Sequence, residues 1–308
     1  MQCMTNDLVT ILIPTFNGSK YIKEMLDSLE RQTYTNIEVI ISDDCSMDNT
    51  VPIIEMWIKQ KKSNKKYTLL KNKHNRGLVR NVKSAKSYIH GQYLFLADQD
   101  DIWEENKVEV QVRYFEKHEE CILNFCDRSI IWNGKTVVSS EARKNNWFDP
   151  IVENTGYVLS HPGRYGANMI AVRNVKNCCR EILDIPDNII EHDTYIVTMA
   201  SLYGTVDFIR IPLVQYRIHH NNLSGNYRVE TARNFIECFT YLRKSAKENY
   251  KCQHRMNDKK IIDGMLKKRW NCIEEYKTVK FSKYHFMEIY KNTMQLLYEN
   301  KIGEFYCE

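Results

Sequence analysis

The chain has 308 residues, a length typical of one or two globular domains with a large hydrophobic core. Hydrophobic residues make up 43% and charged residues 27% of the sequence, which excludes an intrinsically disordered protein. The net charge of +5 arises from a basic stretch after Asn226, for which an anionic membrane surface is a candidate partner.

The sequence shows neither a membrane anchor nor an export signal. No apolar run reaches the roughly 18 residues that a membrane-spanning helix needs. Met1 to Asp7 lack a basic flank followed by an apolar stretch, so we expect no signal peptide. The ten cysteines lack CxxC spacing, which predicts reduced thiols and disfavours a zinc site. These features predict a cytoplasmic protein, with peripheral contact at the inner face of the membrane as a further hypothesis.

Short apolar runs alternate with segments of helical periodicity over the first hundred residues. Strict alternation of this kind predicts right-handed crossovers and a parallel sheet, and therefore an α/β fold. Ser19 is expected to cap the first helix. The predicted strands are 8–13, 37–41, 67–70 and 93–96, and the predicted helices are 20–31, 50–61 and 78–89.

The pattern loosens after residue 121, where shorter strands are expected. Asn133-Gly134 is typical of a tight hairpin turn between two of them. The expected strands are 122–125, 129–132, 136–138, 206–211 and 213–218, and the expected helices are 104–117 and 188–202. Residues 226–308 show helical periodicity rich in Tyr and Lys, which predicts a basic helical C-terminal extension.

Polar and acidic residues follow the predicted strands at 14–17, 42–44, 75–77 and 98–101. Ligands of a parallel sheet bind beyond the carboxyl ends of its strands, so these segments are expected to line one site. Neither GxGxxG nor GxxxxGK[ST] occurs, so a bound phosphate would have to be held through a metal ion.

Asp98-x-Asp100 is the strongest candidate for that metal site. Two carboxylates directly after a buried strand suit Mg²⁺ or Mn²⁺, and such an ion assists departure of a nucleoside diphosphate. The alternative is a solvated acidic turn before the helix that begins near Glu104. Asp43 is a candidate acceptor for a pyrimidine N–H, whereas Asp48 and Thr50 are expected to be structural.

Four segments, taken together, resemble the successive motifs of glycosyltransferase family 2. In chain order they are Pro14-Thr15-Phe16-Asn17-Gly18, Asp43-Asp44-x-Ser46-x-Asp48-x-Thr50, Asn75-x-Gly77 and Asp98-Gln99-Asp100-Asp101-x-Trp103. The resemblance covers about residues 8–225 and extends to rhamnosyltransferase-like members. It implies a GT-A fold, which is an α/β fold with a nucleotide-binding, mostly parallel central sheet flanked by helices. The implied domain is 1–225, with a nucleotide-sugar-binding half at 1–103, an acceptor and catalytic half at 104–225, and the extension at 226–308.

The family pattern assigns roles by position. Asp100, Asp98 and His219 would bind Mn²⁺ or Mg²⁺, with His220 as the alternative imidazole. Trp103 is alternatively a core residue beneath a helix start. The implied donor-binding residues are Pro14, Thr15, Phe16, Asn17, Asp43, Asp44, Asn75, Gly77, Arg80, Asp98, Gln99, Asp101, Trp103 and Arg217.

Inversion at the anomeric carbon requires a base that takes the proton of the acceptor hydroxyl. In the family this base is an acid near the start of a later helix, which here corresponds to Asp193 in Glu191-His192-Asp193. Glu191 is the second candidate. The alternative is that both carboxylates only stabilise the helix N-terminus.

The resemblance implies inverting transfer from a UDP- or dTDP-sugar to a hydroxyl of a glycan or lipid-linked acceptor in bacterial surface polysaccharide synthesis, such as capsule or O-antigen. Rhamnose, glucose, galactose and N-acetylhexosamine remain alternative donor sugars. A metal-dependent nucleotidyltransferase, or another nucleotide-binding α/β enzyme, is the competing hypothesis, and the missing Gly-rich loop disfavours it. A nucleic-acid partner is not expected, because carboxylates at the strand ends repel phosphate.

Overall fold

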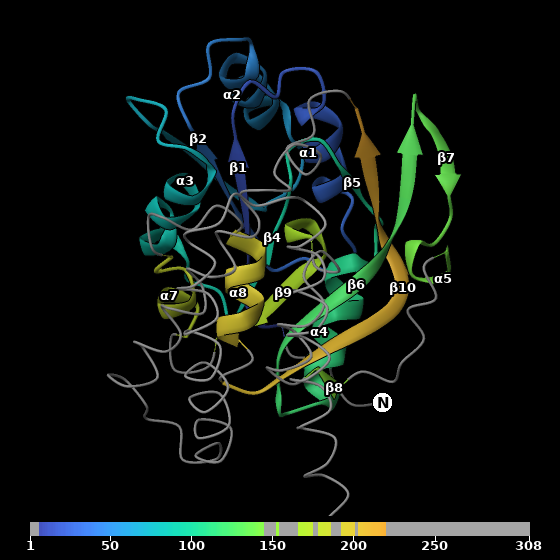
Figure 1. Cartoon of the computed structure of the whole chain (residues 1–308). Helices are drawn as coiled ribbons and strands as arrows, with labels where there is room; N and C mark the ends of the chain where they lie inside the picture. Colours follow the sequence, from blue (N-terminus) through green and yellow to red (C-terminus); the bar gives the residue numbers. More distant parts are fainter. Residues whose placement is uncertain are drawn as a thin grey trace, which may run out of the picture.

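A curled mixed sheet forms the centre of the protein in the computed structural model, which describes residues 6–144, 152–153, 166–174, 178–185, 192–200 and 203–219 (Figure 1). Its strand order is β3-β2-β1-β4-β9-β6-β10-β5, with β7 paired to β6 and β8 paired to β10. The strands are β1 (Val9–Thr15), β2 (Ile37–Asp43), β3 (Lys66–Lys71), β4 (Tyr93–Leu96), β5 (Ile102–Trp103), β6 (Cys121–Trp132), β7 (Lys135–Val138), β8 (Val152–Glu153), β9 (Ile170–Arg173) and β10 (Thr205–Ile218).

Helices cover both faces of this sheet. The described helices are α1 (Ile22–Glu30), α2 (Thr50–Gln60), α3 (Leu78–Ser84), η1 (Lys86–Tyr88), α4 (Lys107–Lys117), α5 (Glu141–Lys144), η2 (Ala167–Met169), α7 (Cys178–Ile182) and α8 (His192–Ala200). Helices α1 and α2 contact each other, whereas α3 and α7 contact η1, and α7 also contacts α8. The chain moves outward from β1 to β3 and then returns across β1 to β4, so right-handed crossovers place α3 on the face opposite to α1 and α2.

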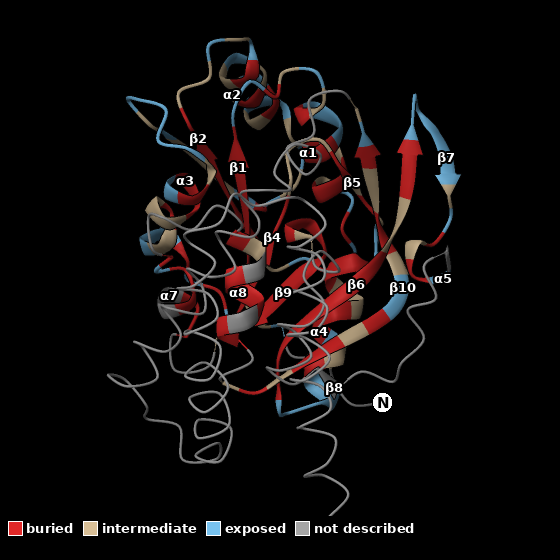
Figure 2. Cartoon of the chain, viewed as in Figure 1, coloured by how far each residue is buried: buried red, intermediate tan, exposed pale blue. Residues whose placement is uncertain are grey.

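The N-terminal half follows the sequence prediction closely. Strands β1 to β4 are parallel, and β1, β2 and β4 are buried because their runs of β-branched and aromatic residues pack between two helical layers (Figure 2). Two details of the prediction were wrong. Tyr21, and not Ser19, precedes the first turn of α1, and no side chain caps this helix; the Ser19 N–H donates to the Asp48 carboxylate. The third helix ends at Ser84 and is followed by a separate 3₁₀ turn.

The C-terminal half contains longer strands than predicted. β6 is one continuous strand, and β10 is one strand with register shifts on either side of Pro212. Proline removes a ladder hydrogen bond, so the sequence pattern suggested a break where the strand instead bulges. Asn133 and Gly134 have φ values of 48° and 74°, which confirms the predicted hairpin turn between β6 and β7.

Strand directions bring distant segments to one edge of the sheet. β9 is antiparallel to both β4 and β6, and β6 is parallel to β10. β10 therefore runs in the same direction as β1, β2 and β4, and the carboxyl ends of these four strands point to the same side of the sheet (Figure 1). The polar segments that follow β1, β2, β4 and β10 therefore lie at the same edge of the sheet.

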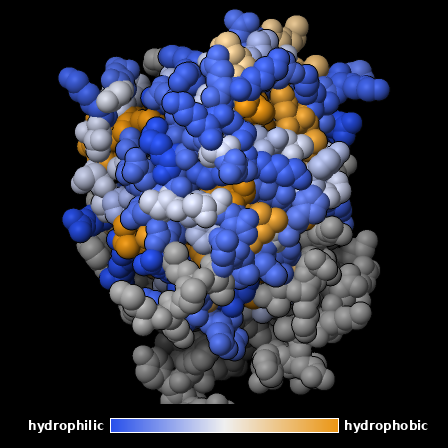
Figure 3. Space-filling model, turned by 180° about the vertical axis from the view of Figure 1, so that it is seen from behind, coloured by the Kyte–Doolittle hydropathy of each residue, from blue (hydrophilic) through white to orange (hydrophobic). Residues whose placement is uncertain are grey.

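The rear face of the described domain is mostly hydrophilic, and its hydrophobic residues gather in small separate patches (Figure 3). Over the part of the chain with described structure, no helix is long and apolar enough to cross a membrane. The cysteines at 45, 121, 126, 178 and 179 form no disulfide. The predicted C-terminal extension at 226–308, together with Glu191 and His220, lies outside the described residues.

Candidate active site

Asp43 ties the end of β1 to the loop after β2. Its carboxylate accepts hydrogen bonds from the Thr15 hydroxyl at 2.9 Å and from the Ser46 hydroxyl at 2.6 Å. The backbone N–H of Ser46 also donates to it, at 2.9 Å. Both carboxylate oxygens are thus engaged within the protein, and the side chain is buried. Asp43, which was expected to accept a hydrogen bond from a pyrimidine ring, therefore connects these two loops.

Asp44 organises the next loop in the same way. Its carboxylate accepts hydrogen bonds from the backbone N–H groups of Arg76 and Gly77, at 3.0 and 2.8 Å, and from the Asn72 side chain at 3.0 Å. Gly77 has a φ of 83°, a conformation that glycine adopts at little cost. Asn75 and Arg80 lie exposed on either side of this turn. The buried carboxylate therefore fixes the turn that presents these two side chains.

The loop after β1 is hydrogen-bonded to the loop after β4, residues 98–101, which we call the acidic loop. The Gln99 side chain accepts from the Phe16 N–H and donates to the Phe16 carbonyl, both at 3.0 Å. Gly18 permits this approach, because a Cβ there would lie 2.1 Å from Gln99 Oε1. Asn17 accepts from the Met47 N–H at 2.9 Å, which joins the loop after β2 to the same unit. The Phe16 ring remains 42% exposed beside these hydrogen bonds.

Asp100 and His219 face each other across the carboxyl ends of β4 and β10. His219 Nε2 lies 2.8 Å from Asp100 Oδ2, and the two side chains are mostly buried. Burial, together with repulsion from Asp100 and Asp193, raises the pKa of Asp98 to about 7. The carboxylates predicted from the sequence are therefore close neighbours in space.

The side chains present fit a metal site with two protein ligands. A carboxylate and an imidazole both suit Mn²⁺, and their facing atoms leave the remaining coordination positions for phosphate oxygens and water. No three His, Cys, Asp or Glu side chains converge on one point among the residues with described structure. Asp100 and His219 are thus the pair whose side-chain atoms meet directly, and Asp98 lies close enough for the charge of Asp100 to raise its pKa.

Asp101, which was expected to bind the donor, has both side-chain oxygens engaged within the protein. Its side chain is fully buried, with Oδ1 accepting from the Arg217 N–H at 2.8 Å and Oδ2 accepting from the Asn168 side chain. Burial and repulsion from Asp100 raise its pKa well above the usual range. Asp101 joins the acidic loop to β10 and η2, and this structural role differs from the one that the motif suggested.

Trp103 is a core residue, which was the alternative given to a donor-pocket role. Its side chain is buried, its backbone N–H donates to the Ser28 hydroxyl at 3.2 Å, and its ring lies 6.0 Å from that of Phe95. The ammonium group of Lys107 stands 4.2 Å from the same ring. The indole therefore anchors the acidic loop from beneath.

Arg217 is held by the protein at several points of its side chain. Nε donates to the Asp100 carbonyl and Nη2 donates to the Glu24 carboxylate, each at 2.8 Å, and the guanidinium lies 4.6 Å from the Tyr21 ring. The residue is only 8% exposed. These contacts connect the end of β10 to α1 and to the main chain of the acidic loop.

Asp193 lies in the first turn of α8 and is partly exposed. Its charge acts on Asp98, so the candidate base stands at the same edge of the sheet as the acidic loop. Sequence reasoning missed Arg128, which lowers the pKa of Asp98, bonds to Glu141 and lies 4.4 Å from the Tyr216 ring. An arginine within the apolar run of β6 was the available signal, since buried charges need partners.

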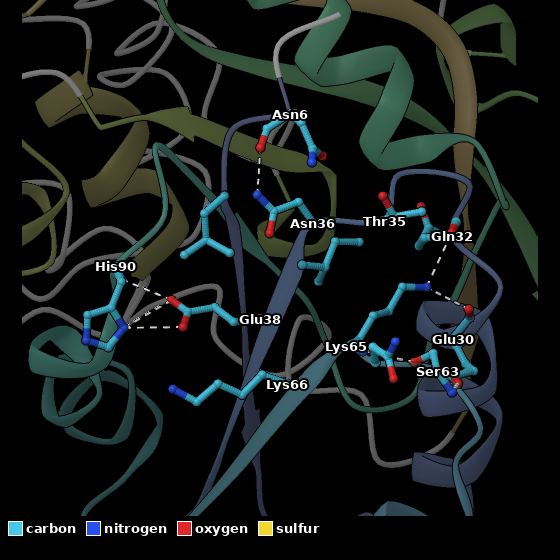
Figure 4. A pocket seen from close by; sticks show the side chains of 13 residues that line it. Asn6, Glu30, Gln32, Thr35, Asn36, Glu38, Ser63, Lys65, Lys66 and His90 are labelled. Atoms are coloured by element: carbon cyan, nitrogen blue, oxygen red, sulfur yellow. Dashed lines mark hydrogen bonds and ion pairs between the residues drawn. The ribbon is translucent and has the colours of Figure 1, made fainter.

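A pocket of about 960 Å³ lies elsewhere, at the amino ends of β1 to β3 (Figure 4). Its polar groups satisfy one another. Glu38 contacts the His90 ring at 3.2 Å and accepts from Thr10 at 2.6 Å, while Lys65 donates to main-chain carbonyls including that of Glu30, at 2.7 Å. Because ligands of such sheets bind at the opposite edge, the acidic loop and not this pocket is the candidate active site.

Comparison with known proteins decides the family. The model of glycosyl transferase family 2 matches residues 10–164, which is half of the chain. The chain belongs to glycosyl transferase family 2. This confirms the family and the glycosyltransferase class that the sequence motifs indicated.

Individual members of the family are distant in sequence. The chain is 29% identical over 154 residues to the Escherichia coli β-1,3-glucosyltransferase WfgD, an alignment covering 50% of this chain and 58% of that enzyme. Staphylococcus aureus TarS 1–349 in complex with UDP-GlcNAc superposes with a TM-score of 0.61 and 17% identity, over 83% of this chain and 70% of TarS. The mannosyltransferase PcManGT of Pyrobaculum calidifontis, in complex with GDP-Man and Mn²⁺, gives 0.59 and 14%, over 98% and 88%. These likenesses confirm the GT-A fold.

Proposed function

We propose that the chain is an inverting, metal-dependent glycosyltransferase that moves a sugar from a UDP- or dTDP-sugar to a hydroxyl group of a glycan or lipid-linked acceptor. The observation that carries this proposal is the meeting of Asp100 with His219 at 2.8 Å, beside Asp98 and within reach of the charge of Asp193. These four side chains come from three elements that are far apart in sequence. All four lie at the carboxyl edge of the sheet, where ligands of such sheets bind.

The donor would lie across the loops after β1, β2 and β4. The exposed Phe16 ring offers a face for the base, and the turn held by Asp44 offers Asn75 and Arg80 to the diphosphate and sugar. Asp100 and His219 would hold Mn²⁺ or Mg²⁺. When bound, this ion neutralises charge on the departing nucleoside diphosphate.

Asp193 would take the proton of the acceptor hydroxyl as its oxygen attacks the anomeric carbon from the face opposite the diphosphate. The side chain is partly exposed at the start of α8, so an acceptor can approach it from solvent. Arg128 would balance the negative charge of the acidic loop from below, since it acts on Asp98 and is itself held by Glu141. In this proposal Asp193 is the general base, and Arg128 is the cation that offsets the charge of the acidic loop.

The relatives suggest the class of substrate. WfgD is named for transfer from UDP-Glc to GlcNAc-diphosphoundecaprenol, and the TarS structure holds UDP-GlcNAc. By analogy, a UDP-hexose or UDP-N-acetylhexosamine donor and an acceptor in bacterial surface polysaccharide synthesis are the first substrates to test. Rhamnose remains an alternative donor sugar.

Asp193→Asn tests the proposal against a purely structural role of that carboxylate. We expect the variant to bind UDP with Mn²⁺ as tightly as the wild type and to lose sugar transfer by at least about a hundredfold, the usual contribution of a general base. The nucleotide product separates the competing hypothesis, because a transferase releases UDP or dTDP whereas a nucleotidyltransferase releases pyrophosphate. Full transfer activity in the variant would exclude Asp193 as the base.

A further inference from the structure

The residue before α1 touches the proposed metal site although no family motif covers it. The Tyr21 ring stacks on the His219 imidazole, with centroids 5.0 Å apart and planes inclined by 27°. The same ring receives the Arg217 guanidinium at 4.6 Å. Arg217 is near the end of β10 and His219 directly follows it, so a single aromatic side chain packs against the end of that strand and the residue after it.

Arg217 provides a second connection between α1 and the proposed metal site. Glu24, one turn along α1, accepts a hydrogen bond from Arg217 Nη2 at 2.8 Å, while Arg217 Nε donates to the Asp100 carbonyl at the same distance. Arg217 therefore links α1 to the main chain of the acidic loop. Asp100 and His219 are thus both held relative to α1. The backbone of Asp100 is held through Arg217 and Glu24, and the His219 ring is held by the Tyr21 ring.

We propose that Tyr21 is a positioning residue that sets the plane of the His219 imidazole so that Nε2 faces Asp100 at the metal site. This inference rests on the proposed function, because it assigns a role within that same site. A histidine ring rotates freely about its side-chain bonds unless a neighbour restrains it, and a stacked ring restrains both its plane and its direction. Groups that orient a metal ligand contribute tenfold to a hundredfold to metal affinity.

The contacts use the face of the Tyr21 ring, so phenylalanine should preserve them and leucine should not. We expect Tyr21→Leu to raise the dissociation constant of Mn²⁺ about tenfold in the presence of UDP, and Tyr21→Phe to leave it within about twofold. Lys20→Met is the matched control. Lys20 also lies over the Tyr21 ring, at 4.8 Å, but contacts neither His219 nor Asp100 in the structure, so this variant should bind Mn²⁺ as the wild type does.

The measurement is an electron paramagnetic resonance titration of Mn²⁺ with the full chain and UDP, which needs no turnover, with a thermal melt of each variant to establish folding. Equal Mn²⁺ affinity of Tyr21→Leu and wild type would overturn the positioning role while leaving the proposed function standing. Loss of affinity in both Tyr21→Leu and Tyr21→Phe would overturn it as well, because the ring face would not be the cause. If the wild type bound no Mn²⁺ with any nucleoside diphosphate, both proposals would fall.

Discussion

Lys107 is a buried lysine that packs against Trp103, and its burial should make the free energy of unfolding depend on pH. Its side chain is fully buried, bonded to Gln111 and flanked by the rings of Phe95 and Trp103 at 5.0 and 4.2 Å. Burial lowers its pKa to about 8, whereas an unfolded lysine titrates near 10.5. Between these two values the unfolded chain binds more protons than the folded one.

The free energy of unfolding should therefore rise with pH through this window as the folded lysine loses its charge. For a folded pKa near 8, Lys107 gives a gain between about 1 and 2 kcal/mol from pH 7 to pH 9. Lys107→Met keeps a similar volume and has no group to titrate, so it should lack this gain.

Urea unfolding of wild type and Lys107→Met at both pH values measures the effect. Comparing the two proteins cancels the buried tyrosines and cysteines, whose raised pKa values act in the opposite direction above about pH 9. We expect the free energy of unfolding of the wild type, relative to that of Lys107→Met, to rise by about 1 to 2 kcal/mol from pH 7 to pH 9. A stability difference that is the same at pH 7 and pH 9 would refute the reasoning, because it would mean that the amine is not desolvated.

Three further substitutions test the loops of the active site. Asp44→Ala removes the acceptor of two backbone N–H groups, so KM for the donor in a transfer assay should rise about tenfold, and an unchanged KM would contradict the role of this turn. Gly18→Ala should displace Gln99 and weaken UDP binding in calorimetry. The same substitution in a Gln99→Ala background should cost much less, and equal costs in both backgrounds would contradict the close approach of Gly18 to Gln99. Asp101→Ala leaves the Arg217 N–H without its acceptor and should lower the free energy of unfolding by about 1 to 3 kcal/mol in urea, whereas no loss would argue against its structural role.

The sequence predicted the N-terminal half well because each of its elements has a strong local signal. The run from Val9 to Ile13 is apolar and β-branched, and β4 has the predicted bounds Tyr93–Leu96. Elements whose form depends on partners were harder to predict. The prediction divided β6 in two because Asp127 and Arg128 interrupt its apolar pattern, although their partners lie within the fold, and it divided β10 at Pro212.

The sequence indicated which segments of the candidate site lie together but not which contacts their side chains make. Motif order alone identified the acidic loop and the segment that ends at His219. It assigned Asp100 to the metal and Asp101 to the donor, but it gave no sign that the side-chain oxygens of Asp101 accept hydrogen bonds inside the protein. The difference between these two aspartates depends on a turn of backbone between adjacent residues. The spacing of apolar residues also gives no sign that the Tyr21 ring stacks on His219, almost 200 residues later in the chain.

Calorimetric titration of UDP, with and without Mn²⁺, into the wild type and Asp100→Ala tests the central claim most directly. The account predicts that Mn²⁺ tightens UDP binding to the wild type by at least about tenfold, and that Asp100→Ala keeps the metal-free affinity but loses this gain. Equal UDP affinity with and without Mn²⁺ in the wild type, or an undiminished gain in the variant, would contradict the assignment of Asp100 and His219 as the metal site.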